Sequence, residues 1–419
     1  MIEKKKLLTA AAGVALATGI TAPVDAKVTL MADEPSGWSF SVDGNVNAFY
    51  VYSTGNDPMK GQATTTYGAA RISINDSARI QTGLLPSKFG FGVSGPASNG
   101  VTLRGYFGLY PQIQNANTKT ARGAQIDMRE IYAAASGDFG EILFGRTLSL
   151  FQRNAIVQDM TLFGVGATGN NVGNGGTTLG RIGFGYVYPD FNAGIRYTSP
   201  ALGMASISVG IFDPSRIRST TGSAQVLASY NQTDTPRFEA ELNIDLSSIS
   251  AGSNFVVSGI YQEAEGGAAA GIVSAGEVEA EGIHVGGTLV ADAFALTAHY
   301  YNGECLGSTV QLDVDAVAAD GTCRDHDGFY VQGTFNYGAG KVGISYGESN
   351  ADQAGNDVND AFSETDKQSM TTVGIYHNLA PEWLAVAEIS QAENEWYGYA
   401  TGEEDGESSI FAVGMFYLW

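Results

Sequence analysis

The sequence contains few cysteines, prolines and histidines, and these shortages argue against several classes of protein. There are 2 Cys, 11 Pro and 4 His among 419 residues. Two cysteines with no further ligands nearby are too few for a structural zinc site or a disulfide-dense fold. The histidines are scattered, and none has a nucleophile motif beside it, which argues against an enzyme. They are His284, His299, His326 and His377. We expect no cofactor and no metal ion.

Basic residues are also scarce. Lys and Arg number 22 against 44 Asp and Glu, which gives a formal net charge of −22. Nucleic-acid binding depends on clustered Lys and Arg that neutralise phosphates, so we expect no nucleic-acid partner. An acidic surface instead attracts cations.

Long apolar runs are absent after the first 26 residues. No later stretch approaches 18 consecutive apolar residues, which excludes membrane-spanning helices. The first segment has the layout of a secretory signal: three lysines at 4–6, an apolar run over 7–20 and small residues before Lys27. That run is shorter than the roughly 20 residues of a spanning helix. We therefore expect a cleaved signal peptide at 1–26 and a single exported domain at 27–419.

The sequence does contain many two-residue alternations of apolar and polar side chains, for example over residues 40–52, 238–247, 329–337 and 411–419. This period is typical of strands with two different faces. A soluble β-sandwich alternates as well. However, these segments exceed the usual five or six residues of soluble strands, and aromatic residues gather at their ends. Both features favour strands that cross a bilayer at a tilt.

The connections between these segments alternate between short and long. Residues 199–203 and 378–381 are tight turns, whereas 305–327 and 348–368 are long and polar. A sheet inside lipid must close, because no water can satisfy an open edge. At about 24 residues per strand and connection, the exported chain accommodates about 16 strands. The predicted fold is all-β, a transmembrane antiparallel β-barrel.

Two loop features each allow more than one interpretation. Cys305 and Cys323 flank a polar segment, and in an exported chain such a pair can form a loop disulfide. The acid-rich residues 356–360 could hold Ca²⁺, but they lack the spacing of an EF-hand and favour a solvated loop.

Three stretches resemble the Gram-negative general porin family. Residues 137–146 (GDFGEILFGR) are similar to the family's turn and fifth strand, and residues 195–200 (IRYTSP) to a strand end. The aromatic C-terminal strand is the third, although Trp419 departs from the family's usual Phe. The resemblance implies a trimeric 16-stranded barrel in the bacterial outer membrane, in contact with its lipids. It also implies that the assembly machinery recognises the terminal strand.

In this family the third extracellular loop folds inward and narrows the pore, and the resemblance places that loop at about 147–180. Residues 158–164 look like its inward segment, in which Asp159 matches the family's acid before Met. The family's second acid is absent, because Leu162 takes its place. Arginines of the facing wall are the matching partners of loop acids, or they pair with nearby acids elsewhere. The candidates are Arg71, Arg79, Arg104, Arg129, Arg181 and Arg196, with Arg129 and Arg181 ranked first.

The resemblance implies a water-filled channel for passive diffusion of small hydrophilic solutes and ions. The excess of acids predicts weak cation selectivity, which the wall arginines oppose. A solute-specific channel remains open, as do two other classes, a barrel enzyme of the outer membrane and a secreted β-rich adhesin. Stepwise conductance in planar bilayers separates the channel from the other classes.

The last strand carries one feature that does not fit an open lumen. Phe411, Val413, Met415, Tyr417 and Trp419 share one face by alternation, and Phe416 and Leu418 therefore point the other way. Large apolar side chains are poorly suited to a wet interior. We therefore expect this strand to contact protein on both of its faces.

Overall fold

The computed structural model describes residues 28–33, 36–55, 76–96, 98–114, 126–168, 177–218, 229–266, 276–313, 315–318, 320–355, 364–397 and 405–419. The expected signal segment at 1–26, Arg71 and the acid-rich residues 356–360 lie outside this part of the chain. Within it, the helical elements are α1 (Arg153–Gln158) and the 3₁₀ turn η1 (Met160–Phe163). Neither of these is long and apolar enough to cross a membrane.

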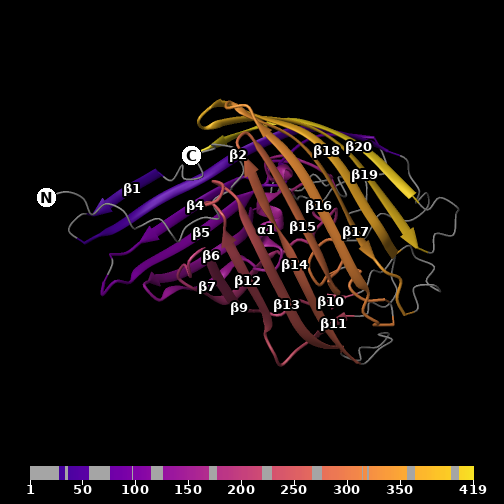
Figure 1. Ribbon diagram of the computed structural model, residues 1–419, viewed down its shortest axis with the longest axis horizontal. Coiled ribbons are helices and arrows are strands. Elements are labelled where there is room, and N and C mark those ends of the chain that lie inside the picture. Colours follow the sequence, from indigo (N-terminus) through magenta and orange to yellow (C-terminus); the bar gives the residue numbers. More distant parts are fainter. Residues whose placement is uncertain are drawn as a thin grey trace, which may run out of the picture.

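The described strands form one antiparallel sheet (Figure 1). They are β1 (Val28–Asp33), β2 (Trp38–Gly55), β3 (Ser77–Gln81), β4 (Lys88–Ser94), β5 (Thr102–Pro111), β6 (Ile126–Gly137), β7 (Gly140–Leu148), β8 (Phe191–Thr198), β9 (Ala205–Phe212), β10 (Ile217–Arg218), β11 (Ser229–Gln232), β12 (Arg237–Asp245), β13 (Asn254–Gly266), β14 (Glu277–Ala291), β15 (Phe294–Glu304), β16 (Asp325–Asn336), β17 (Gly340–Ala351), β18 (Glu364–Ala380), β19 (Trp383–Tyr397) and β20 (Asp405–Leu418).

The sheet closes because β2 pairs with β20 along one edge and with β3 and β4 along the other. β3 and β4 follow one another along the same edge of β2. In the same way β9 continues into β10, and β11 continues into β12. β1 pairs with β2 beyond the end of β20 and is not counted as a strand of the ring. With β1 left out and each of these pairs counted as one strand, the described chain forms a closed barrel of 16 antiparallel strands. The predicted fold class is therefore confirmed.

The two ends of the barrel differ in the length of their connections. At one end the turns are short, as between β6 and β7, β14 and β15, or β18 and β19. The C-terminus joins β2 at this same end, where Trp419 and Gly44 exchange backbone hydrogen bonds of 2.8 and 3.0 Å. The opposite end carries the long connections, including residues 149–190 between β7 and β8.

The alternation predicted from sequence separates the outer face of the barrel from the inner one. On β15, Phe294 and Leu296 are exposed on the outside, whereas Thr297, His299 and Tyr301 are buried inside. A band of exposed apolar side chains suits contact with hydrocarbon, because lipid rather than water covers it.

Folded loops fill much of the barrel interior. We call the described residues 149–168 and 177–188 the inner segment, and the described residues 305–313, 315–318 and 320–324 the stapled loop. The inner segment packs with inward-facing side chains of β2, β16 and β18 to β20 in one hydrophobic cluster. Parts of both loops pack against β10, β11 and β13 to β15 in a second cluster. The wall formed by β4 to β8 remains accessible.

The final strand contacts protein on its inner face, as predicted, whereas its outer face, for which the same contact was predicted, is exposed in the described chain. Phe416 is 0% exposed, and its ring lies 5.7 Å from that of Phe49 and 5.5 Å from that of Phe163. Phe411 and Tyr417 are exposed on the outer face. An aromatic residue can therefore occupy an inward position here, because the inner segment excludes water from it.

Candidate functional site

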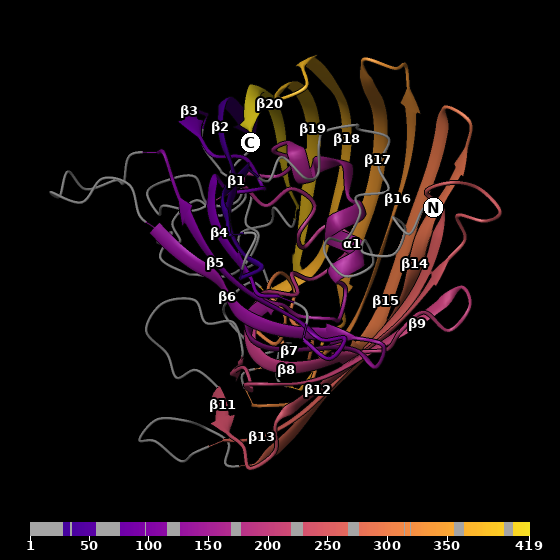
Figure 2. The ribbon, with the colours of Figure 1, turned by 90° about the vertical axis from the view of Figure 1, so that its left-hand side faces the viewer.

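The inner segment enters the barrel directly after β7, and Figure 2 shows α1 within the ring of strands. The turn into α1 passes through Gln152, which adopts a left-handed conformation with φ 61° and ψ 9°. Its side chain accepts a hydrogen bond from the backbone of Val187 at 2.9 Å, which joins the two arms of the segment.

Two carboxylates on opposite walls hold the inner segment through its backbone. Glu239 on β12 accepts hydrogen bonds from the amides of Leu150 and Phe151 at 2.6 and 2.8 Å. Glu388 on β19 accepts from Val165 at 2.7 Å and from Gly166 at 3.0 Å. Hydrogen bonds to charged acceptors are stronger than neutral ones, so these acids fix the position of the segment.

A glycine permits the close approach of the segment to β19. A Cβ atom at Gly164 would overlap the carboxylate of Glu388. The hydroxyl of Tyr376 donates to the other oxygen of Glu388 at 2.5 Å. Both oxygens of this buried acid therefore serve as acceptors within the protein.

Asp159 is placed inside the inner segment. It is 1% exposed and accepts hydrogen bonds from the backbone of Thr161 at 2.9 Å, its hydroxyl at 2.6 Å and the hydroxyl of Tyr186 at 3.1 Å. An Asp at this position caps a helical turn by satisfying its first amides. In this arrangement the Asp159 carboxylate does not line an open passage.

Arg181 is buried as well, and it donates to the carbonyl of Met370 at 2.9 Å. Burial lowers the pKa of its guanidinium, while the nearby negative charge of Asp159 opposes that shift. Burial also raises the pKa of Tyr186 well above its ordinary value, and Asp159 adds to the effect. Asp159, predicted as the loop acid of the constriction, and Arg181, predicted as one of its wall arginines, thus both hold the inner segment in place.

The open space lies on the opposite side of the segment, against β4 to β8. It is a cavity of about 580 Å³ within the described residues. The barrel wall contributes four basic side chains, and the facing loops contribute mainly apolar ones together with the basic Arg153 of α1. The charged lining residues are Lys88, Arg104, Arg129, Arg153, Arg196 and the single acid Glu130. The apolar ones include Leu84, Leu85, Ile156, Val157, Leu162, Leu179 and Ile182.

Aromatic rings support two of these arginines. The guanidinium of Arg104 lies 6.0 Å from the ring centre of Tyr132. That of Arg129 lies 5.7 Å from the ring centre of Tyr110 and 5.9 Å from that of Phe191. A planar cation stacks favourably on a ring face while its N–H groups stay free to bind at its edge.

Acids on the strands beside the cavity pair with several of the same cations. Arg104 contacts Glu141 at 2.7 Å, and Lys88 contacts Asp43 at 3.1 Å. Arg153 contacts Glu241 at 2.5 Å. Of these acids, none lines the described cavity, so the cations stand between them and the open space.

Of the six arginines predicted from sequence, the cavity brings together Arg104, Arg129 and Arg196. Arg79 on β3 is half-buried and does not line it. Sequence reasoning missed Lys88 and Arg153. For Lys88, the available signal was the two-residue alternation of β4, which places its side chain on the inner face. No sequence pattern predicts that Arg153 lines the cavity, because the direction of its side chain depends on how the inner segment folds.

A model of the Gram-negative porin family matches residues 7–396. The chain belongs to the Gram-negative porin family. Membership identifies a channel of the bacterial outer membrane, in agreement with the closed barrel and its apolar outer band. No curated protein matches this porin in sequence.

Several solved structures share the fold of this porin. The outer membrane channel DcaP of Acinetobacter baumannii has a TM-score of 0.66 at 13% identity, covering 93% of this chain and 99% of that one. An anion-selective porin from Comamonas acidovorans has a TM-score of 0.60 at 14% identity, covering 91% and 100%. OmpT of Vibrio cholerae in a trimer form has a TM-score of 0.53 at 13% identity, covering 91% and 99%.

Proposed function

We propose that this porin lets small hydrophilic solutes diffuse passively through the outer membrane and prefers anions among them. The observation that supports this preference is the cavity lining, in which five basic side chains accompany one acid. A ring or row of Arg and Lys in a narrow wet section favours anions, because it lowers their electrostatic barrier and raises that of cations.

The acids that would oppose this preference are occupied elsewhere. Glu239 and Glu388 accept hydrogen bonds from the inner segment, and Asp159 caps η1. The side of the cavity formed by the loops is therefore mainly apolar, adds the basic Arg153 and offers no carboxylate opposite the arginines of the wall. The expected transverse arrangement of loop acid and wall arginine does not describe this cavity.

The cation preference expected from the sequence followed from the net charge of −22. That charge is summed over the whole chain, including outer loops. At physiological salt, exposed charges are largely screened beyond about 8 Å. The charges nearest the permeating ion therefore decide the selectivity, and in this cavity they are basic.

Reversal potential tests the proposal. Purified porin in a planar bilayer under a tenfold KCl gradient should give stepwise channels. Their reversal potential should have the same sign as the chloride equilibrium potential. A reversal potential with the sign of the potassium equilibrium potential would contradict the anion preference. Absence of channels from folded protein would contradict the diffusion function itself. It would favour one of the two other classes, a barrel enzyme or an adhesin.

We also propose that the porin is a homotrimer with its outer band in contact with lipid. The trimer form of the Vibrio cholerae neighbour supports this assembly. The terminal strand, whose alternate residues are exposed and apolar, is the proposed signal for the outer-membrane assembly machinery.

A further inference from the structure

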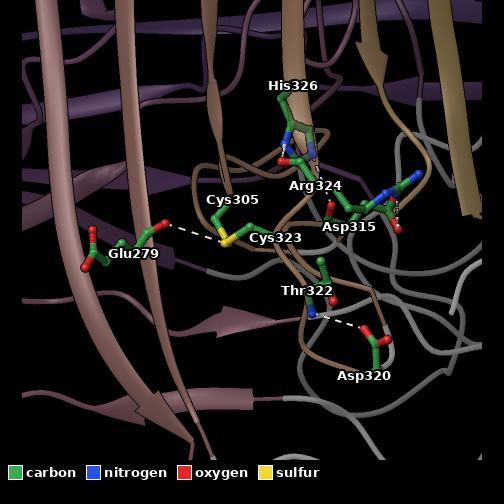
Figure 3. Close-up of a disulfide and its surroundings, with 8 residues drawn as sticks. All are labelled: Glu279, Cys305, Asp315, Asp320, Thr322, Cys323, Arg324 and His326. Carbon is green, nitrogen blue, oxygen red and sulfur yellow. Dashed lines mark hydrogen bonds and ion pairs between the residues drawn. A yellow bond between two sulfur atoms is a disulfide. The ribbon is translucent and has the colours of Figure 1, made fainter. Parts of the chain in front are cut away.

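The stapled loop connects β15 to β16 and is closed at its base. Cys305 and Cys323 form a disulfide, and their Cα atoms lie 4.9 Å apart (Figure 3). The amide of Cys305 also donates to the carbonyl of Arg324 at 3.0 Å. The two ends of the loop are therefore fixed side by side.

From this base the loop folds into the barrel instead of away from it. Leu306, Leu312 and Val317 are all 0% exposed and pack in a cluster with Phe151. The wall has space for this cluster because two glycines face it. A Cβ at Gly282 would lie 3.0 Å from Leu306 and Phe151, and one at Gly303 would lie 2.9 Å from Leu306.

A buried acid adds polar contacts at the centre of the loop. Asp315 accepts hydrogen bonds from the hydroxyls of Ser308 at 3.0 Å and Thr365 at 2.7 Å. Arg324 lies 3.9 Å from its other oxygen, and both side chains are 0% exposed. Figure 3 shows Asp315 and Arg324 beside the disulfide. Thr365 belongs to β18, so these contacts fasten the loop to the wall beyond its own two strands.

The stapled loop also contacts the inner segment directly. The amide of Tyr188 donates to the carbonyl of Thr309 at 2.8 Å, and the amide of Gln311 donates to that of Tyr188 at 3.1 Å. Thr309 and Val310 then form part of the cavity lining. The stapled loop is thus a component of the passage wall.

We infer that the stapled loop is a second constriction element, which sets the bore and the selectivity of the channel together with the inner segment. This inference rests on the proposed diffusion function. The loop fills the interior beside β10, β11 and β13 to β15. Solutes therefore pass along the opposite, basic wall formed by β4 to β8. A wider lumen would let ions pass farther from those arginines, where water and salt screen their charge.

Excision of the loop gives the direct test. Replacing residues 307–321 by two glycines keeps the disulfide, and the short Cα separation of its cysteines suits a hairpin. Single-channel conductance should rise at least twofold over the parent protein, the size limit for neutral sugars should increase, and anion preference should fall. Heat-modifiable migration on gels reports that the barrel has folded.

A milder pair of variants covers the case in which the excised chain does not fold. Asp315→Asn removes the buried charge and loosens the loop while the staple remains. Asp292→Asn makes the same change at the short turn between β14 and β15, at a left-handed position (φ 53°) that Asn also tolerates. Asp315→Asn should raise conductance or its fluctuation, whereas Asp292→Asn should not.

The outcomes separate this inference from the function on which it rests. If the parent protein conducts but the folded excision variant has the same conductance and sugar limit, the stapled loop is no constriction element. The same conclusion follows if Asp315→Asn and Asp292→Asn behave alike. If the parent forms no channels at all, the diffusion function fails first.

Discussion

The charged residues of the lumen fall into two groups according to what they touch. Glu239, Glu388 and Asp159 accept hydrogen bonds from backbone amides of the inner segment and are buried. Arg104 and Arg196 reach the cavity. A buried carboxylate that accepts several hydrogen bonds contributes to loop position, while an arginine at the water boundary contributes to ion selectivity.

Neutralising one lining arginine should weaken the anion preference. A unit charge about 6 Å from an ion in water interacts with it by about 0.7 kcal/mol. Because this charge lowers the barrier for anions and raises that for cations by the same amount, we expect Arg196→Gln to lower the anion-to-cation permeability ratio about tenfold, as measured by reversal potential.

Arg146→Gln is the matched control on the neighbouring strand. Arg146 pairs in register with Ile131, which is 50% exposed on the outer face, so its side chain points away from the lumen. This variant should keep the parent selectivity. Equal shifts in the two variants would show that selectivity follows overall charge rather than the cavity.

Among the elements, the inner segment depends most on contacts outside itself. α1 and η1 have 6 and 4 residues, and helices this short are not stable alone. Their position comes from wall acids, from the clearance at Gly164 and from packing against β16 and β18 to β20. Removal of one anchor should therefore move the segment without opening the barrel.

Glu388→Ala tests this dependence. The change leaves the amides of Val165 and Gly166 and the hydroxyl of Tyr376 without their acceptor, and each buried unsatisfied donor costs about 1–3 kcal/mol. We expect increased open-channel current noise and closure at lower voltage, with a barrel that still folds. Glu382→Ala, at the exposed turn before β19, should behave like the parent. Quiet channels from Glu388→Ala would show that packing alone holds the segment.

The alternation in the sequence was sufficient to predict the barrel, because lipid outside and protein or water inside impose opposite demands on successive residues. It correctly assigned Phe238 outward and Glu239 inward. It could not tell that Glu239 would bind a loop, since that contact joins residues 88 positions apart. Asp159 shows the same limit. Its motif indicated the right segment, but only the folded turn decides whether its carboxylate faces water or its own backbone.

For the whole molecule, the main consequence of the fold is a barrel with an apolar exterior and a largely filled interior. The two internal clusters give the wall support from within, so its rigidity does not depend on lipid alone. The exterior presents an apolar band, and in the proposed trimer part of it would contact a second copy of the chain.

The proposed trimer predicts a mass of three chains for the detergent-solubilised protein. Light scattering with the detergent contribution subtracted measures this mass. Bilayer recordings should show closure in three equal steps at high voltage, because each barrel conducts independently. A monomeric mass together with single-step closure would contradict the trimer while leaving the channel function intact.

The contact between Val165 and Glu388 spans 223 positions of the chain and has a consequence for the order of folding. β19 is among the last strands to be made, so the anchor for Val165 arrives long after the inner segment itself. Contacts of such separation form slowly, because a long stretch of chain must be ordered before they contribute. We therefore expect the part of the inner segment around Val165 to dock late in assembly, after the part that Glu239 on β12 holds.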